Sequence, residues 1–155
     1  EATESTPPTM IKVDTQALTT CEDDSTDIAV SVATWNLAEL VVEEEGSKWM
    51  RKFRTTKLDG SSKGSDIVLI SGQECENIKP RRAEGHRSRE YRRLMIKMLG
   101  RNYVPLALHS LGGIQFGLFC KRSILHEIEF CSVADVAVGI GNVFHNKGAI
   151  GAFVQ

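Results

Sequence analysis

Hydrophobic and polar positions alternate along much of this chain, and the period of the alternation changes from one segment to the next. Residues 28–33 alternate branched hydrophobic side chains with small ones and lead into Thr34-Trp35-Asn36. Residues 66–71 contain four consecutive hydrophobic residues and are followed by Gly72-Gln73-Glu74. Both patterns predict core strands that end in polar loops.

Two other segments have hydrophobic residues at helical spacing. In the first, Trp49, Met50 and Phe53 follow Ser47, a candidate N-cap, which predicts a short helix. The second follows Ser88 and ends at Gly100, and it predicts a helix whose hydrophobic stripe belongs to the core. The residues of that stripe fall at i, i+3, i+4, i+7 and i+8: Tyr91, Leu94, Met95, Met98 and Leu99.

Beyond Gly100 the period changes to two, which is typical of strands. Turn signals separate the strand candidates at Gly112-Gly113, at Lys121-Arg122 and along a loop at 139–148. We therefore expect an α/β arrangement in which helices cover a mixed sheet. The strand candidates are residues 103–109, 114–120, 127–133 and 149–154.

The composition fits an ordinary soluble domain. The chain has 155 residues, of which 41% are hydrophobic and 25% charged, which excludes a collagen, a coiled coil and a wholly disordered protein. Its hydrophobic runs are shorter than the ~20 residues of a membrane-spanning helix. Four widely spaced cysteines predict reduced thiols, so we expect a cytoplasmic location, with peripheral membrane contact as an open alternative. They are Cys21, Cys75, Cys120 and Cys131.

The net charge of −1 hides an uneven distribution of charge. Residues 1–27 hold seven acidic residues and one Lys, a net charge of −6, and their Ser, Thr and Pro content predicts a disordered acidic linker. Residues 79–101 hold nine basic and two acidic residues, a net charge of +7. This basic segment is either a surface that attracts anionic lipid or a solvated helix face.

Polar side chains at the ends of the first two predicted strands are candidate metal ligands. Asn36 follows one strand and Glu74 the other, and ligands of α/β proteins often bind outside strand ends. Mg²⁺ prefers hard oxygen ligands and needs only one or two protein carboxylates. The alternative is that each residue caps a turn or a helix.

The loop at 139–148 is a candidate phosphate site. Its glycines let backbone amides approach an anion, Lys147 supplies a positive charge, and Asn146 supplies a side-chain donor. The Gly-Lys-Ser/Thr order of a P-loop is missing, and a glycine-rich hairpin turn is the alternative interpretation.

Taken together and in this order, four motifs resemble the inositol polyphosphate 5-phosphatases of the endonuclease/exonuclease/phosphatase superfamily. The resemblance extends from about residue 28 to residue 154, and the glycine-containing approach to the last motif narrows it from the superfamily to the 5-phosphatases. The motifs are Thr34-Trp35-Asn36, Gln73-Glu74, Leu111-Gly112-Gly113-Ile114 and Asn146-Lys147-Gly148.

The resemblance implies the first half of a four-layer α/β/β/α sandwich of the DNase I type. It implies hydrolysis of the 5-phosphate of an inositol phosphate or phosphoinositide with Mg²⁺, and no nucleic acid partner. Glu74 would be the direct metal ligand, with Asn36 in the same metal site. Asn146 and Lys147 would contact the phosphorylated head group.

The chain also departs from the family. Val143-Phe144-His145 precedes Asn146 where the family is richer in glycine, and Ala149 replaces a frequent second glycine. The later family motifs, which carry the general-base Asp and the catalytic His, have no counterpart in residues 1–155. We therefore expect residues 28–155 to be the N-terminal portion of a catalytic domain, active only within the parent protein. The alternatives are a phosphodiesterase of the same superfamily, acting on nucleic acid or sphingolipid, and a non-catalytic module that binds anionic lipid.

Overall fold

The structure is a computed structural model, and it describes residues 28–54, 64–76, 85–138 and 147–155. The predicted linker at 1–27, Asn146, and the three basic residues Lys79, Arg81 and Arg82 of the basic segment lie outside the described residues. The elements, in chain order, are β1 (Val30–Asn36), α1 (Glu44–Ser47), the 3₁₀ helix η1 (Lys48–Arg54), β2 (Ile67–Gln73), α2 (His86–Leu99), β3 (Tyr103–Leu111), β4 (Ile114–Lys121), the 3₁₀ helix η2 (Arg122–Glu127), β5 (Cys131–Val138) and β6 (Lys147–Val154).

The larger sheet has four strands in the order β1-β2-β4-β3. Strands β1 and β2 are parallel, with Asn36 opposite Gln73, whereas β4 pairs antiparallel with both β2 and β3. Strands β5 and β6 form a separate antiparallel pair. The mixed sheet expected from the sequence is confirmed. Its parallel pair brings the ends of the first two predicted strands to the same edge.

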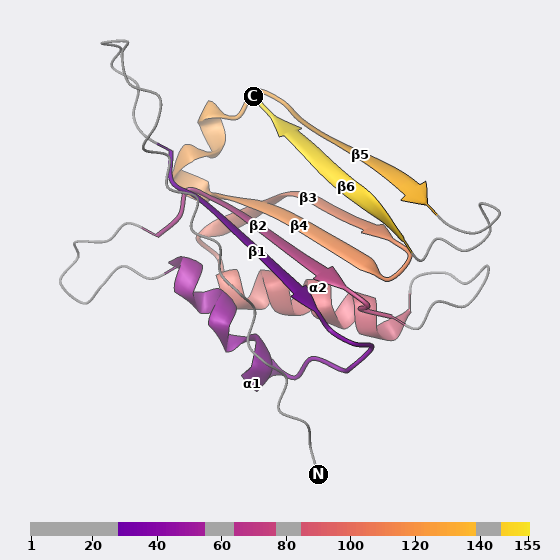
Figure 1. Cartoon of the computed structure of the whole chain (residues 1–155). Helices are drawn as coiled ribbons and strands as arrows, with labels where there is room; N and C mark the ends of the chain where they lie inside the picture. The colour runs from indigo at the N-terminus through magenta and orange to yellow at the C-terminus, as the bar shows by residue number, and fades with distance from the viewer. Residues whose placement is uncertain (1–27, 55–63, 77–84, 139–146) are drawn as a thin grey trace, which may run out of the picture.

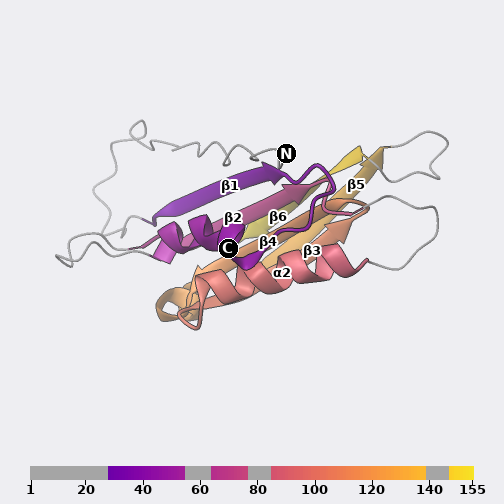
Figure 2. The same ribbon diagram turned by 90° about the horizontal axis from the view of Figure 1, so that it is seen from below.

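Three layers are stacked in the molecule. Helix α2 and the short helices α1 and η1 cover one face of the four-stranded sheet, and β5 and β6 lie over β3 and β4 on the other face (Figures 1 and 2). His109 on β3 and Asp135 on β5 link the two sheets, with 2.9 Å between His109 Nε2 and Asp135 Oδ1. The arrangement follows the helix–sheet–sheet order of the expected sandwich.

The hydrophobic core lies between α2 and the four-stranded sheet. All five hydrophobic residues of the predicted α2 stripe are buried, which confirms the helix and its core face. They pack with Val68 and Ile70 of β2 and with Met50 and Phe53 of η1. Each fully buried hydrophobic side chain contributes about 1.5–3 kcal/mol, so this cluster holds the helix layer on the sheet.

Helix α2 ends where the sequence predicts but begins earlier. Gly100 adopts φ = 72° and its N–H donates to Ile96 O, as a terminating glycine does. The helix starts at His86 rather than after Ser88, because a carboxylate outside the helix caps it. Glu76 Oε2 accepts hydrogen bonds from the backbone N–H groups of Arg87 at 3.1 Å and Ser88 at 3.3 Å.

Two other boundary predictions are wrong. Ser47 is the last residue of α1 rather than an N-cap, and its hydroxyl donates to Glu44 O at 2.8 Å. The strand predicted at 127–133 begins only at Cys131, because residues 122–127 coil into η2. The strand then continues to Val138, because β6 supplies hydrogen-bond partners along its whole length.

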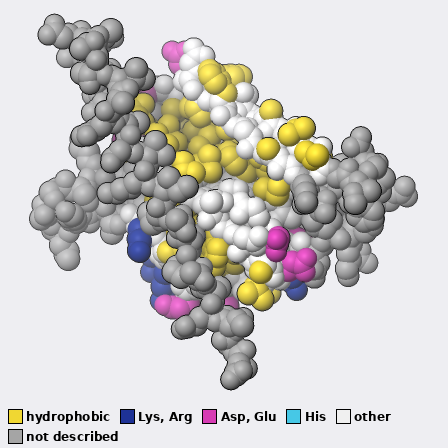
Figure 3. All heavy atoms as spheres, in the orientation of Figure 1, with side chains coloured by type: hydrophobic (Ala, Val, Ile, Leu, Met, Phe, Trp, Pro, Cys, Tyr) yellow, Lys and Arg dark blue, Asp and Glu magenta, His cyan; other side chains and the backbone are white. Residues whose placement is uncertain are grey.

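The prediction of β1 as a core strand is only half right. Ala33 faces the core, but Val30 and Val32 on the opposite face are 56% and 39% exposed, because β5 and β6 lie mainly over β3 and β4. Figure 3 shows hydrophobic side chains open to view between the larger sheet and β5–β6. Other exposed hydrophobic residues on the second sheet are Val136, Val138 and Phe153.

Among the described cysteines, Cys75 and Cys120 are buried and Cys131 is partly buried, and none of the three forms a disulfide. Among the described helices, none is both long enough and hydrophobic enough to cross a membrane.

Candidate functional site

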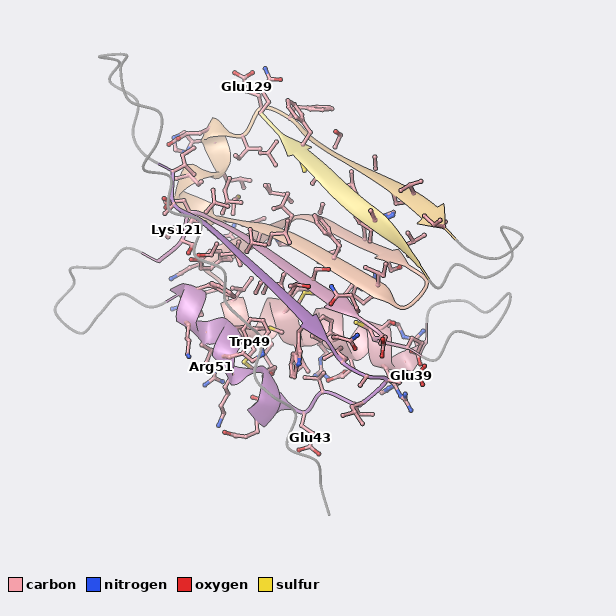
Figure 4. All side chains as sticks on the ribbon, viewed as in Figure 1. Glu39, Glu43, Trp49, Arg51, Lys121 and Glu129 are labelled. Atoms are coloured by element: carbon pink, nitrogen blue, oxygen red, sulfur yellow. The ribbon has the colours of Figure 1, made fainter. Side chains whose placement is uncertain are left out.

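Asn36 and Glu74 meet at the ends of the parallel strands. The Asn36 amide nitrogen Nδ2 donates to Glu74 Oε1 at 2.8 Å, and both side chains are exposed. Gln73, which lies opposite Asn36 in the register of β1 and β2, donates from Nε2 to Thr34 Oγ1 at 2.6 Å. The first two sequence motifs thus form a single polar edge. Glu39, labelled in Figure 4, marks this end of the molecule.

The backbone continues to pair beyond the strands and thereby fixes this edge. Leu37 N donates to Gln73 O at 2.8 Å, and Glu39 N donates to Glu74 O at 2.9 Å. Glu74 and Glu39 adopt positive φ values of 52° and 60°, which are uncommon for residues other than glycine. The two loops hold each other in a conformation that neither would favour alone, and such conformations cluster at functional sites.

The position of Asn36 suggests that it orients the carboxylate rather than binding a metal directly. Its Oδ1 already accepts a hydrogen bond from Ala38 N at 2.8 Å, which turns Nδ2 toward Glu74. Glu74 offers an exposed carboxylate, the donor that Mg²⁺ prefers. The residues therefore fit a hard divalent cation with Glu74 as ligand and Asn36 behind it, and their role in metal binding stays a prediction.

The third motif lies directly beside Glu74. Gly112 and Gly113 form the turn between β3 and β4, and Gly112 adopts φ = 56°. Cys75 N, one residue after Glu74, donates to Gly113 O at 2.8 Å. The turn therefore supports the backbone that presents the Glu74 carboxylate.

The fourth motif begins β6 at the same end. Lys147 opens the strand opposite Val138, and Gly148 lies so close to the β3–β4 turn that a Cβ there would be 2.5 Å from Leu111 Cδ2. The backbones of the first three motifs lie at this edge together with Lys147 and Gly148 of the fourth. Asn146 lies outside the described residues. Figure 1 shows the ends of β1 and β2, the β3–β4 turn and the start of β6 at one edge.

A buried layer supports the Glu74 turn from within. Cys75 is 1% exposed, and burial raises the pKa of its thiol to about 12, so it is a packing residue and not a nucleophile. Burial also raises the pKa of Tyr91. A Cβ at Gly72 would be 2.6 Å from both Cys75 Sγ and Tyr91 Cε1. Only glycine fits at this point of β2.

Some buried polar atoms near this layer have no protein partner among the described residues. They are the Tyr91 hydroxyl, the Ser88 hydroxyl, and both polar atoms of the Gln115 side chain. Gln115 pairs with Gly72 across the β2–β4 ladder, so it lies within the same layer as Cys75. Buried polar groups of this kind usually bind internal water.

A small cavity opens beside Asn36. Its volume is about 230 Å³, and hydrophobic residues of the loop after β1 form most of its lining. Trp35, one of the lining residues, stacks edge-on against Trp49 with ring centroids 5.9 Å apart. Leu40 and Val41 at the rim are 52% and 62% exposed. A cavity with a mainly hydrophobic lining therefore adjoins the polar edge on one side.

Sequence reasoning missed two residues that hold the site together. Glu76 caps α2, and one guanidinium N–H of Arg87 donates to the carbonyl of Glu39 in the loop after β1. Neither contact has a local sequence signal, since the cap joins residues 11 apart and the loop contact joins residues 48 apart. In the described part of the chain, no three His, Cys, Asp or Glu side chains form a metal cluster.

Comparison with known proteins identifies a family and a similar fold for the chain. The family model described as endonuclease/exonuclease/phosphatase family 2 matches residues 33–155. Among solved structures, the chain is similar to the inositol polyphosphate 5-phosphatase domain of SPsynaptojanin in complex with inositol (1,4)-bisphosphate and a calcium ion, with a TM-score of 0.60 and 23% identity. That similarity covers 83% of this chain and 36% of the other. No curated protein matches the chain.

The fold is thus the DNase I-like fold. The chain spans about a third of the similar 5-phosphatase domain. The chain belongs to the endonuclease/exonuclease/phosphatase family 2.

Proposed function

We propose that the parent protein of this chain hydrolyses the 5-phosphate of an inositol phosphate or a phosphoinositide with the aid of Mg²⁺. The observation that carries the proposal is the contact between Asn36 and Glu74, in a member of a phosphatase-containing family. The similar SPsynaptojanin domain was solved with inositol (1,4)-bisphosphate and calcium, which supports an inositide ligand and a divalent cation.

The proposed reaction is hydrolysis of a phosphate monoester. Water adds its oxygen to phosphorus and gives up a proton, the bond from phosphorus to the inositol oxygen breaks, and the inositol oxygen takes up a proton and leaves as a hydroxyl. A divalent ion in such a site neutralises the charge of the phosphoryl oxygens. Glu74 would hold the ion, while Asn36 keeps the carboxylate oriented through the 2.8 Å hydrogen bond.

Lys147 and Asn146 are proposed contacts of the phosphorylated head group. Support comes from the backbone: Lys147 begins β6, and the adjoining Gly148 packs against Leu111 at the edge that holds Glu74. A lysine near that edge supplies a point charge for a phosphate. Lys147→Ala is expected to raise the KM for the inositide more than it lowers kcat, because the contact serves binding.

The full-length protein provides the direct test. It is incubated with Mg²⁺ and either a 5-phosphorylated inositide or the matching isomer without the 5-phosphate, and released phosphate is measured. Phosphate should come only from the first substrate, and chelation of the cation should stop the reaction. Equal release of phosphate from both isomers would contradict specificity for the 5-phosphate. Nicking of plasmid DNA without inositide turnover would indicate a nuclease instead of a phosphatase.

A further inference from the structure

A group of polar side-chain atoms is buried behind the Glu74 turn without a hydrogen-bond partner among the described residues. They are the hydroxyl oxygens of Ser88 and Tyr91 on α2 and both polar atoms of the Gln115 side chain on β4. Ser88 and Tyr91 are each 1% exposed and Gln115 is 0% exposed, so bulk solvent does not reach them. Buried polar groups in folded proteins are almost always hydrogen-bonded, either to protein or to ordered water.

The register of the sheet directs these side chains into one space. Gln115 lies directly opposite Gly72 in the β2–β4 pair, and opposite residues of an antiparallel pair project to the same face. That face is the one covered by α2, because a Cβ at Gly72 would be 2.6 Å from Tyr91 Cε1. Ser88 lies one turn before Tyr91 on the same face of the helix, and helical side chains lean toward the N-terminus. The two hydroxyls and the amide therefore project into the space between α2 and the start of β4.

Together these groups supply the hydrogen bonds that an internal water molecule needs. The amide of Gln115 offers two N–H donors and an acceptor oxygen, and each hydroxyl can donate and accept. An internal water typically makes about three hydrogen bonds, to buried groups that have no other partner. A water in this space would thus bridge β4 to α2.

The same space adjoins the residues that directly follow Glu74 in the chain. On the strand side, a backbone hydrogen bond joins Gln115 to the Cys75 thiol. On the helix side, the backbone N–H of Ser88 donates to Glu76 Oε2 at 3.3 Å. Gln115 and Ser88 therefore each hold one of the two residues after Glu74.

We propose that Gln115, Ser88 and Tyr91 bind an internal water that fixes the Glu74 turn, and that Gln115 is thereby a positioning residue for the metal-binding carboxylate. The water ties together the strand and the helix between which the turn is held. Glu74 adopts φ = 52°, and such a conformation persists only when the surrounding structure maintains it. The inference rests on the proposed function, because that proposal makes Glu74 the metal ligand.

The first test is a crystal structure of the full-length protein at a resolution that shows ordered water. A water should lie within hydrogen-bond distance of the Gln115 amide and of at least one of the hydroxyls of Ser88 and Tyr91. The proposal is overturned if no water is present there, or if the Gln115 amide bonds directly to the Tyr91 hydroxyl. Neither result depends on a metal ion or a substrate.

The second test measures the Mg²⁺ dissociation constant of the full-length Gln115→Met variant by isothermal titration. Methionine is about as large as glutamine, but its thioether is only a weak acceptor, so the variant loses the bonds to the water. The dissociation constant should rise about tenfold, and excess Mg²⁺ should restore phosphate release, because the carboxylate itself remains. Circular dichroism confirms folding, and Tyr91→Phe, which removes only a hydroxyl, replaces the variant if it does not fold.

The matched control is Ser47→Ala in α1. It removes another buried hydroxyl, one that donates to Glu44 O at 2.8 Å, and it should keep the wild-type Mg²⁺ affinity. Wild-type affinity in Gln115→Met would overturn the positioning role. An equal loss in Ser47→Ala would also overturn it, since reduced stability would then explain both.

The wild type separates this inference from the proposed function. Mg²⁺ binding without release of phosphate from the inositide would contradict the proposed substrate and leave the positioning role standing. No Mg²⁺ binding by the wild type would overturn the metal site and the positioning role together.

Discussion

Asn36 Nδ2 lies 2.8 Å from Glu74 Oε1, although the two residues are 38 positions apart in the sequence. The contact exists because β1 and β2 run parallel and end together, and because Ala38 N holds the other end of the Asn36 amide. In metal sites, a residue that orients a ligand is worth 10–100-fold in metal affinity.

Asn36→Ala should therefore weaken Mg²⁺ binding about 10–100-fold without unfolding the protein. The loss arises because Glu74 is no longer oriented, although its carboxylate remains. Isothermal titration with Mg²⁺ measures the dissociation constant directly. An unchanged dissociation constant would show that Asn36 has only a structural role in the turn.

The cap on α2 comes from Glu76, whose carboxylate accepts two backbone N–H groups of the first turn. Glu76→Ala leaves these donors without their acceptor and should lower the free energy of unfolding by about 1 kcal/mol. Urea denaturation measures the change. Glu90→Ala is the control, because it removes only an exposed i, i+3 pair with Arg93 and should cost about 0.2–0.5 kcal/mol. Equal losses in the two variants would refute the capping role.

Gly72 has no room for a side chain. Because a Cβ would lie 2.6 Å from both Cys75 Sγ and Tyr91 Cε1, Gly72→Ala should destabilise the protein by about 1–3 kcal/mol. Gly46 in α1 is the matched comparison, since nothing lies within 4 Å of its Cβ position, and Gly46→Ala should stabilise by about 0.5–1 kcal/mol. Thermal denaturation of both variants tests the pair. A neutral Gly72→Ala would mean that the layer behind Glu74 is loosely packed.

Burial of the Cys75 thiol links stability to pH. Its pKa rises from 9.0 to about 12 in the folded protein, so the folded state holds this proton more tightly than the unfolded state. The resulting stability is complete below pH 9 and is lost as the pH rises from 9 to about 12. In that window the wild type should lose up to about 1.4 kcal/mol more per pH unit than Cys75→Ala.

Urea denaturation at several alkaline pH values provides the measurement for Cys75. Cys131→Ala is the control, because Cys131 is only partly buried and that variant should follow the wild type. Parallel loss of stability in the wild type and Cys75→Ala would contradict the assignment.

Local patterns predicted much of this fold, and the reason is visible in α2. Its hydrophobic stripe from Tyr91 to Leu99 requires only the helical repeat and a hydrophobic sheet to pack against. Both features can be recognised from the spacing of hydrophobic residues in the sequence. The polar ends of β1 and β2 were predictable for the same reason, because buried strands end where oxygen-bearing side chains begin. The structure then shows that β1 and β2 are parallel neighbours, and this pairing brings Asn36 and Glu74 together.

The missed helix cap and the unexpected exposure of β1 depend on residues that are far apart in the sequence. Nothing in the sequence near Gly85 indicates that Glu76 will cap the helix. The strand predicted at 127–133 begins later than expected because the chain first forms η2. The exposure of Val30 and Val32 depends on how far the second sheet extends over β1. The alternation of hydrophobic and polar residues within β1 does not predict that extent. Local periodicity specifies the secondary-structure elements and their buried faces, whereas helix caps and the extent of each sheet depend on tertiary structure.

The central claim is that Glu74 holds the metal ion of a phosphate-releasing site. The most direct measurement is phosphate release from a 5-phosphorylated inositide by the full-length Glu74→Gln variant, with Mg²⁺ binding measured in parallel. Glu43→Gln, at an exposed position before α1, is the isosteric control. Loss of a metal-ligand carboxylate should lower kcat/KM by at least about 100-fold and abolish tight Mg²⁺ binding, while the control keeps both. Wild-type turnover and Mg²⁺ affinity in Glu74→Gln would contradict the account.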